Sequence, residues 1–308
     1  MAMAAFAIVL ALAAACSSWT SGSTGPEDDG GALTVVATTN FAADWVENIG
    51  GDGVEIFSLV PVGADPHAVA PGARDVARVA DADLVVSVGL GLEASWLSDL
   101  VVNAAADASR VVSLGEVADP IKGAGGNDLP NSGPFDPHFW LDPVRVKLAV
   151  SEVAMRLSST RPENGAVYEE NAAIYNRRLD DLHLWIKGQV AVIPSDRRLL
   201  VASHDSLRYF ASRYGFEIVG TIMPGTTTER EPSAEELAAL VRRMEELDAS
   251  TVFGETTANE RLAEAIVAET DARLVRLHTG SVGPPGSGAE TYVEMMRTNV
   301  KLIVEALR

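Results

Sequence analysis

The chain has 308 residues, of which 47% are hydrophobic and 22% are charged, as in an ordinary globular protein. This length can bury a sizeable core and favours two domains. The formal net charge of −19 argues against nucleic-acid binding, because phosphate contacts need Lys and Arg, and it is compatible with the attraction of cations.

Residues 1–16 are predicted to be a secretory signal segment. The stretch 1–15 is uncharged and rich in Ala and Leu, and it is shorter than the ~20 apolar residues that span a bilayer. Cys16, the single cysteine, follows small residues and precedes a polar stretch, which resembles a bacterial lipoprotein processing site. Cys16 is therefore the predicted lipidation site, and the alternative is a plain signal-peptidase cut near an unmodified cysteine. Residues 17–31 indicate a flexible tether.

Residues 32–160 alternate between strand and helix patterns and are predicted to form an N-terminal α/β lobe. Asn40 is expected to cap the first helix. The alternation is typical of a parallel sheet covered by helices. Apolar, β-branched runs predict strands at 33–38, 54–60, 84–88 and 110–114, the segments between them predict helices at 40–50, 71–81 and 93–106, and 123–133 is a Gly/Asn/Pro loop.

Residues 161–193 are predicted to form one long linking helix that begins at Pro162. About thirty helical residues span ~45 Å, the length of a whole domain, so this helix is expected to join two lobes. Its apolar stripe repeats at steps of three and four: Tyr168, Ala172, Tyr175, Leu179, Leu182, Ile186 and Val190.

Residues 194–308 repeat the alternation and predict a C-terminal α/β lobe. Ser233 and Glu236 form a capping box at a helix start. The fold class is therefore α/β, with two parallel-sheet lobes joined by one long helix. The predicted strands are 198–202, 217–221, 251–253 and 274–277, and the predicted helices are 205–213, 233–248, 258–270 and 290–307.

Three of the five histidines lie near predicted strand or helix ends: His67, His138 and His204. Neutral imidazole is a common ligand for zinc and its neighbours. The spacings of 71 and 66 residues are far longer than those of a zinc finger, so only a whole fold can bring these ligands together. Since parallel α/β sheets bind ligands beyond the carboxyl ends of their strands, we expect all three to face one crevice between the lobes.

Four segments resemble the zinc- and manganese-binding solute receptors of bacterial ABC importers. The resemblance covers about residues 32–308 and implies two lobes with one metal between them. It places His67, His138 and His204 on three of the four ligand positions of that family. The segments are Asp-Pro-His at 65–67 with 82–93, Asp-Pro-His-Phe-Trp-Leu-Asp-Pro at 136–143, Ser-His-Asp-Ser-Leu-Arg-Tyr-Phe at 203–210, and Thr-Tyr-Val-Glu-Met-Met-Arg-Thr-Asn at 291–299.

The fourth position departs from the family, which often carries an acidic residue where this chain has Gly280. Glu255, at the end of a predicted strand, is the candidate replacement, and the alternatives are a water ligand or a role for Glu255 behind a ligand or as a helix cap. Asp205 is expected to point away from the metal and to brace a helix. Nitrogen-rich ligands and the Irving–Williams order favour Zn²⁺, with Mn²⁺ as the alternative.

The leading interpretation is a non-enzymatic, monomeric, extracytoplasmic receptor, either lipid-anchored to the cell membrane or periplasmic, that delivers zinc to an ABC permease. Two alternatives stay open. One is a zinc-dependent hydrolase or hydratase, because three histidines with an open position can activate water. The other is a surface adhesin, a description given to some relatives. His183 and His278 are expected to be surface or packing residues.

Overall fold

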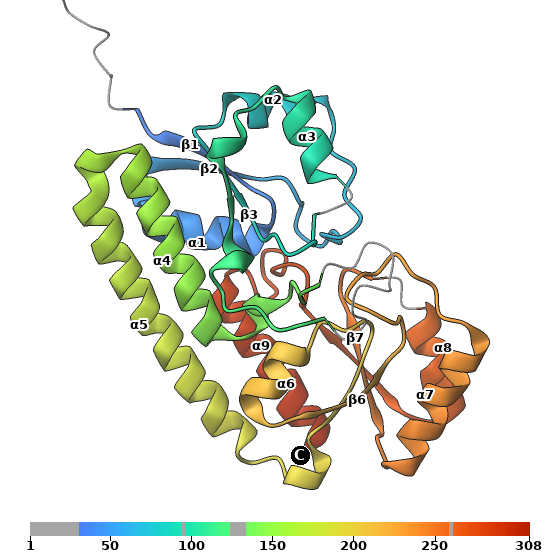
Figure 1. Cartoon of the computed structure of the whole chain (residues 1–308). Helices are drawn as coiled ribbons and strands as arrows, with labels where there is room; N and C mark the ends of the chain where they lie inside the picture. Colours follow the sequence, from blue (N-terminus) through green and yellow to red (C-terminus); the bar gives the residue numbers. More distant parts are fainter. Residues whose placement is uncertain (1–30, 94–95, 124–133, 259–260) are drawn as a thin grey trace, which may run out of the picture. The chain divides into compact units, whose positions relative to one another are not determined.

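The computed structural model describes residues 31–93, 96–123, 134–258 and 261–308 (Figure 1). Its contacts divide the chain into residues 1–31 and residues 32–308, and the fold described here belongs to the second unit. The predicted signal segment, Cys16, nearly all of the tether, and most of the loop at 123–133 lie outside the described residues. Within the described part, no helix is long and apolar enough to cross a membrane.

The first sheet contains four parallel strands in the order β2-β1-β3-β4. Alternate residues of its strands are buried on opposite faces. Val35 and Val86 join the cluster formed with α1, α4 and α5, whereas Val36 and Val85 join the cluster formed with α2 and α3. The strands are β1 (Leu33–Ala37), β2 (Val54–Ser58), β3 (Leu84–Ser87) and β4 (Val111–Ser113), and the helices are α1 (Asn40–Gly50), α2 (Ala73–Asp81), α3 (Leu97–Asn103) and α4 (Pro143–Thr160).

Two details of this lobe correct the sequence interpretation. Thr39, not Asn40, caps α1, since its side chain accepts a hydrogen bond from the backbone N–H of Ala42. A helix was expected to start at His138, but a 3₁₀ turn covers Phe139–Leu141 and α4 begins at Pro143, with Asp142 as its cap.

The predicted long helix is present as α5 (Gly165–Val190), and its buried residues are the seven of the predicted apolar stripe. The segment from Pro162 to Asn164 forms a 3₁₀ turn before it. Figure 1 shows α4 and α5 running side by side, and α5 also packs against α1 and α9. The helix therefore joins the two lobes while it is packed along its length, rather than as an isolated strut.

The second sheet repeats the topology of the first, with parallel strands in the order β6-β5-β7-β8. The predicted capping box of Ser233 and Glu236 opens α7. The predicted class of two parallel-sheet α/β lobes joined by a long helix is confirmed, and the lobe boundaries at 160/161 and 193/194 stay predictions. The strands are β5 (Leu199–Ala202), β6 (Glu217–Thr221), β7 (Thr251–Glu255) and β8 (Arg273–Leu277), and the helices are α6 (Arg208–Tyr214), α7 (Ala234–Glu246), α8 (Arg261–Thr270) and α9 (Tyr292–Leu307).

Candidate metal centre

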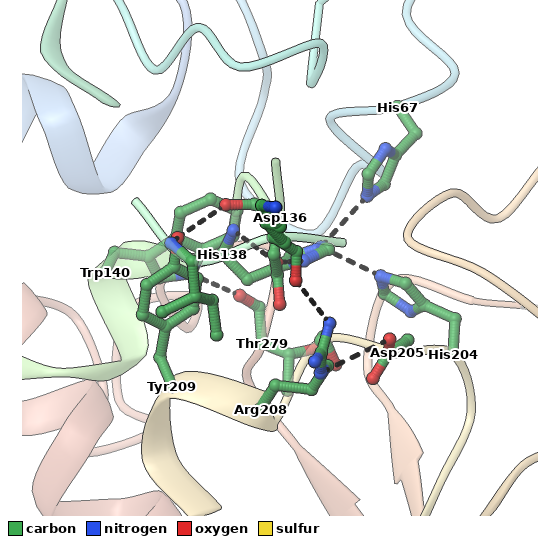
Figure 2. Close-up of polar contacts among 12 residues, drawn as sticks. His67, Asp136, His138, Trp140, His204, Asp205, Arg208, Tyr209 and Thr279 are labelled. Carbon is green, nitrogen blue, oxygen red and sulfur yellow. Dashed lines mark hydrogen bonds and ion pairs between the residues drawn. The ribbon is translucent and has the colours of Figure 1, made fainter. Parts of the chain in front are cut away.

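The three predicted histidines meet at one point, although they come from three separate segments (Figure 2). His67 lies in the loop after β2, His138 directly precedes a 3₁₀ turn at Phe139–Leu141, and His204 follows β5. All three side chains are buried. Nε2 of His138 lies 3.3 Å from Nε2 of His67 and 3.0 Å from Nε2 of His204.

These separations match the spacing of imidazoles around one metal ion. Zinc–nitrogen bonds of about 2.0–2.1 Å at tetrahedral angles place neighbouring nitrogens about 3.3 Å apart. The candidate ligand atoms of His67, His138 and His204 all lie within 4.8 Å of one another. The arrangement can therefore hold a single small cation with three nitrogen ligands.

A buried carboxylate lies behind each of two rings. Nδ1 of His138 lies 2.8 Å from Oδ1 of Asp136. Nδ1 of His204 and Oε1 of Glu255 form an ion-pair contact at 2.7 Å. Carboxylates in this position fix the ring orientation and leave Nε2 free to bind metal.

The electrostatic surroundings of the three rings differ. Burial, followed by the neighbouring imidazoles, holds the pKa of His67 and of His138 well below the usual value. Burial also lowers the pKa of His204, but the combined effect of Glu255, Asp65 and Asp136 exceeds it, so the net shift is upward. Nε2 of His204 and Nε2 of His138 are within hydrogen-bond distance, and a bound cation would take the place of the hydrogen between them.

The structure puts Glu255 behind His204. Its carboxylate faces Nδ1, which is the ring nitrogen remote from His138, and it also accepts a hydrogen bond from the hydroxyl of Ser206 at 3.2 Å. Within the described residues, the group that could hold a metal consists of the three histidines and does not include Glu255. The geometry favours the role behind a ligand, and direct coordination by Glu255 stays a prediction.

Gly280 lies beside the loop of His67. A Cβ atom at this position would approach Cδ of Pro66 to 3.0 Å and Oγ1 of Thr257 to 3.3 Å. Gly280 is not among the residues with positive φ, so its backbone conformation is open to other residues. The backbone therefore does not require glycine here, but any side chain would need Pro66 and Thr257 to shift slightly.

The remaining predicted polar residues lie outside the histidine group. Asp205 pairs weakly with Arg208 at the start of α6, with 3.8 Å between Oδ2 and Nε, as expected for a residue that braces a helix. His183 lies 3.2 Å from the hydroxyl of Tyr214 and His278 lies 3.3 Å from the hydroxyl of Thr256. Neither histidine belongs to the candidate metal group.

The sequence interpretation gave no role to Asp136, although a signal for it was present. The tripeptide Asp-Pro-His occurs twice, at 65–67 and 136–138. In both copies Oδ1 of the aspartate accepts a hydrogen bond from the backbone N–H of the histidine at 2.9 Å. The repeat therefore marks a local turn that orients each candidate ligand from within its own segment.

The comparisons with known proteins agree with this fold. The family model of ZnuA, the periplasmic component A of the zinc-uptake complex, matches residues 35–306. The manganese-binding lipoprotein MntA of Halalkalibacterium halodurans is 35% identical over 285 residues, which cover 92% of this chain and 91% of that protein. The manganese ABC transporter substrate-binding lipoprotein PsaA of Streptococcus mitis is 31% identical over 280 residues, 89% of each chain. The solved structure of the periplasmic zinc-binding protein TroA from Treponema pallidum has a TM-score of 0.80 at 28% identity and covers 90% of this chain and 99% of its own.

Proposed function

The chain belongs to the ZnuA family of periplasmic metal-uptake components, and on that premise we propose that it is the extracytoplasmic receptor of a metal ABC importer. The single observation that supports this function most strongly is the convergence of three buried histidines at the junction of the two lobes. The metal is cargo: it is captured between the lobes and delivered to a membrane permease.

We propose that His67, His138 and His204 bind the ion and that it is zinc. Three neutral imidazoles form a nitrogen-rich site, which favours zinc, whereas manganese prefers oxygen ligands. Manganese is the competing cargo, since both MntA and PsaA are named for manganese. Among the relatives cited above, TroA is the one named for zinc.

The proposed location is outside the cytoplasmic membrane, with Cys16 as the site of a lipid anchor and the receptor acting as a monomer. Two of the relatives are named lipoproteins. Labelling of cells with a lipid precursor and comparison with Cys16→Ser would test the anchor. A wild-type chain that takes up no label would refute lipidation at Cys16 and leave the receptor function intact.

Neither alternative function is proposed. A hydrolase would need a general base beside the metal, and the carboxylate of Glu255 is engaged with Nδ1 of His204 and with Ser206. The relatives cited above are named for metal binding or transport and not for catalysis or adhesion. The proposed function is therefore that of a receptor and not of an enzyme.

Titration of the metal-free protein with zinc and with manganese tests the proposal. We expect one bound ion per chain, tighter binding of zinc, and a loss of at least about a hundred-fold in affinity for alanine variants of each of the three histidines. His183→Ala is the matched control, because this histidine lies on α5 outside the candidate site, and it should bind like the wild type. Equal affinities in all four variants would refute the ligand assignment.

A further inference from the structure

We propose that Thr228 sets the rate at which metal leaves the site, because its hydroxyl group holds Asp65 across the cleft between the two lobes. This inference rests on the proposed receptor function and adds a positioning residue to it. Thr228 belongs to the segment between β6 and α7 in the second lobe, and Asp65 belongs to the loop between β2 and α2 in the first.

The contact between these residues is short. Oγ1 of Thr228 donates to Oδ2 of Asp65 at 2.6 Å, which is within the range of hydroxyl–carboxylate hydrogen bonds, and these are stronger than bonds between neutral groups. Asp65 and Thr228 are both half-buried. The hydroxyl group therefore stabilises a carboxylate that has lost part of its hydration.

The same carboxylate orients a candidate metal ligand. Oδ1 of Asp65 accepts a hydrogen bond from the backbone N–H of His67 at 2.9 Å. Oδ1 of Asp65 thus stabilises the turn that carries His67, and Oδ2 attaches that turn to the opposite lobe. Loss of the Thr228 hydroxyl would release the turn without removing any metal ligand.

The segment that carries Thr228 is in turn attached to the residues on either side of His204. The backbone N–H of Met223 donates to the carbonyl of Ser203 at 2.7 Å, and that of Asp205 donates to the carbonyl of Gly225 at 2.9 Å. Asp65 and Thr228 therefore complete a chain of hydrogen bonds from His67 to His204. This chain links the segments that carry two candidate ligands from opposite lobes.

The contact lies in the wall of a cavity of about 570 Å³, whose lining includes Asp65, Ala68, Thr228 and Thr257. Asp65 and Ala68 flank His67 in the sequence, so the cavity adjoins the turn of that ligand. Separation of Asp65 from Thr228 would open the site from this side. Other hydrogen bonds between the lobes near the site join Asn40 and Gly63 to Ser281, Trp140 to Thr279, and Tyr209 to Asp136. None of them contacts Asp65, so they do not replace this contact.

The test measures zinc release from the full-length protein by stopped flow after addition of excess chelator. Thr228→Val removes the hydroxyl group at nearly constant volume, and we expect it to release zinc about ten-fold faster, since loss of one charge-assisted hydrogen bond is worth about that factor. The association rate should change less than about two-fold. Thr228→Ser restores the hydroxyl group and should restore the wild-type release rate.

Thr227→Val is the matched control in the same segment. The hydroxyl of Thr227 accepts a hydrogen bond from the backbone N–H of Glu229 at 3.2 Å, so its loss perturbs the loop without touching Asp65. An equal acceleration in Thr227→Val, a wild-type release rate in Thr228→Val, or no rescue by serine would each overturn the proposed role of Thr228.

Hydrogen exchange in the metal-free protein supplies a second measurement that does not depend on binding. Thr228→Val should accelerate exchange of the amides at 63–68, including that of His67, while Thr227→Val should not. Unchanged exchange in this segment would overturn the proposal. A wild-type chain that binds neither zinc nor manganese would instead refute the receptor function, so the two failures are distinguishable.

Discussion

Replacement of Glu255 by glutamine tests how the second lobe presents its ligand to the metal. The carboxylate lies 2.7 Å from Nδ1 of His204, and both residues are buried. Glutamine retains an oxygen acceptor at the same position but carries no charge. Loss of a carboxylate behind a metal-bound histidine typically costs about 10- to 100-fold in affinity, and we expect Glu255→Gln to fall in this range.

The magnitude separates the two possible roles of Glu255. If the carboxylate bound the ion directly, glutamine would replace an anionic ligand by a neutral one, and the variant should approach the loss seen in His204→Ala. If it acts through His204, the loss should be clearly smaller than in that variant. Competitive titration of zinc against a chelator of known affinity measures both variants on one scale.

X-ray absorption of the zinc-loaded proteins gives an independent answer. We expect the wild type and Glu255→Gln to show the same number of nitrogen and oxygen neighbours, because the carboxylate faces the ring nitrogen remote from the metal site. Removal of one oxygen neighbour in the variant, or an unchanged zinc affinity with normal folding, would refute the positioning role.

Three further predictions follow from the geometry. Gly280→Asp should fold, since φ at Gly280 is not positive and the 3.0 Å approach of Cβ to Pro66 needs only a small shift. It should strengthen the binding of manganese more than that of zinc because it adds an oxygen ligand. Equal manganese affinities of Gly280→Asp and Gly280→Asn would contradict this. Zinc at a thousand-fold excess over Kd should raise the free energy of unfolding by about 4 kcal/mol and therefore raise the melting temperature. The metal-free protein should still unfold cooperatively, since the hydrophobic clusters of both lobes do not depend on metal. Burial raises the pKa of Asp44 to about 6. The protonated side chain therefore stabilises the fold at low pH, and this contribution of at most about 3 kcal/mol is lost as pH rises from about 4 to about 6. Asp44→Asn keeps an acceptor for Tyr175 and should flatten this loss of unfolding free energy in urea titrations, whereas a wild-type pH profile in the variant would contradict the assignment.

The strands were predictable because each is a short apolar run bounded by turn residues. All eight appeared within a few residues of their predicted bounds. For α4 only the start was predicted, at His138, although its buried residues at 146, 149, 150, 153, 154 and 157 repeat at helical spacing as far as Leu157. The helix cap was misplaced by one residue, since Thr39 and Asn40 are both good capping types and only the backbone conformation distinguishes them.

The histidine cluster could be predicted because parallel strands of each lobe end at a common edge, which gathers the residues that follow them. Which nitrogen of His204 the carboxylate of Glu255 faces could not be predicted from the sequence. Its place at the end of β7 puts it near His204, but whether a carboxylate faces Nε2 or Nδ1 depends on the rotamers of both side chains. The contact between Thr228 and Asp65 joins residues 163 positions apart, and nothing local in either segment indicates it.

The contacts between the lobes divide into two kinds with different consequences. Far from the site, α5 packs its apolar stripe against α1 and α9 and keeps the lobes together. Near the site, hydrogen bonds also join the lobes, among them those from Asn40 and Gly63 to Ser281, from Trp140 to Thr279, and from Thr228 to Asp65. Water can replace each of these bonds at a small net free-energy cost, whereas exposing the apolar stripe would cost far more. The proposed role of Thr228 follows from this division, because its hydrogen bond to Asp65 can break while the packing of α5 keeps the lobes attached.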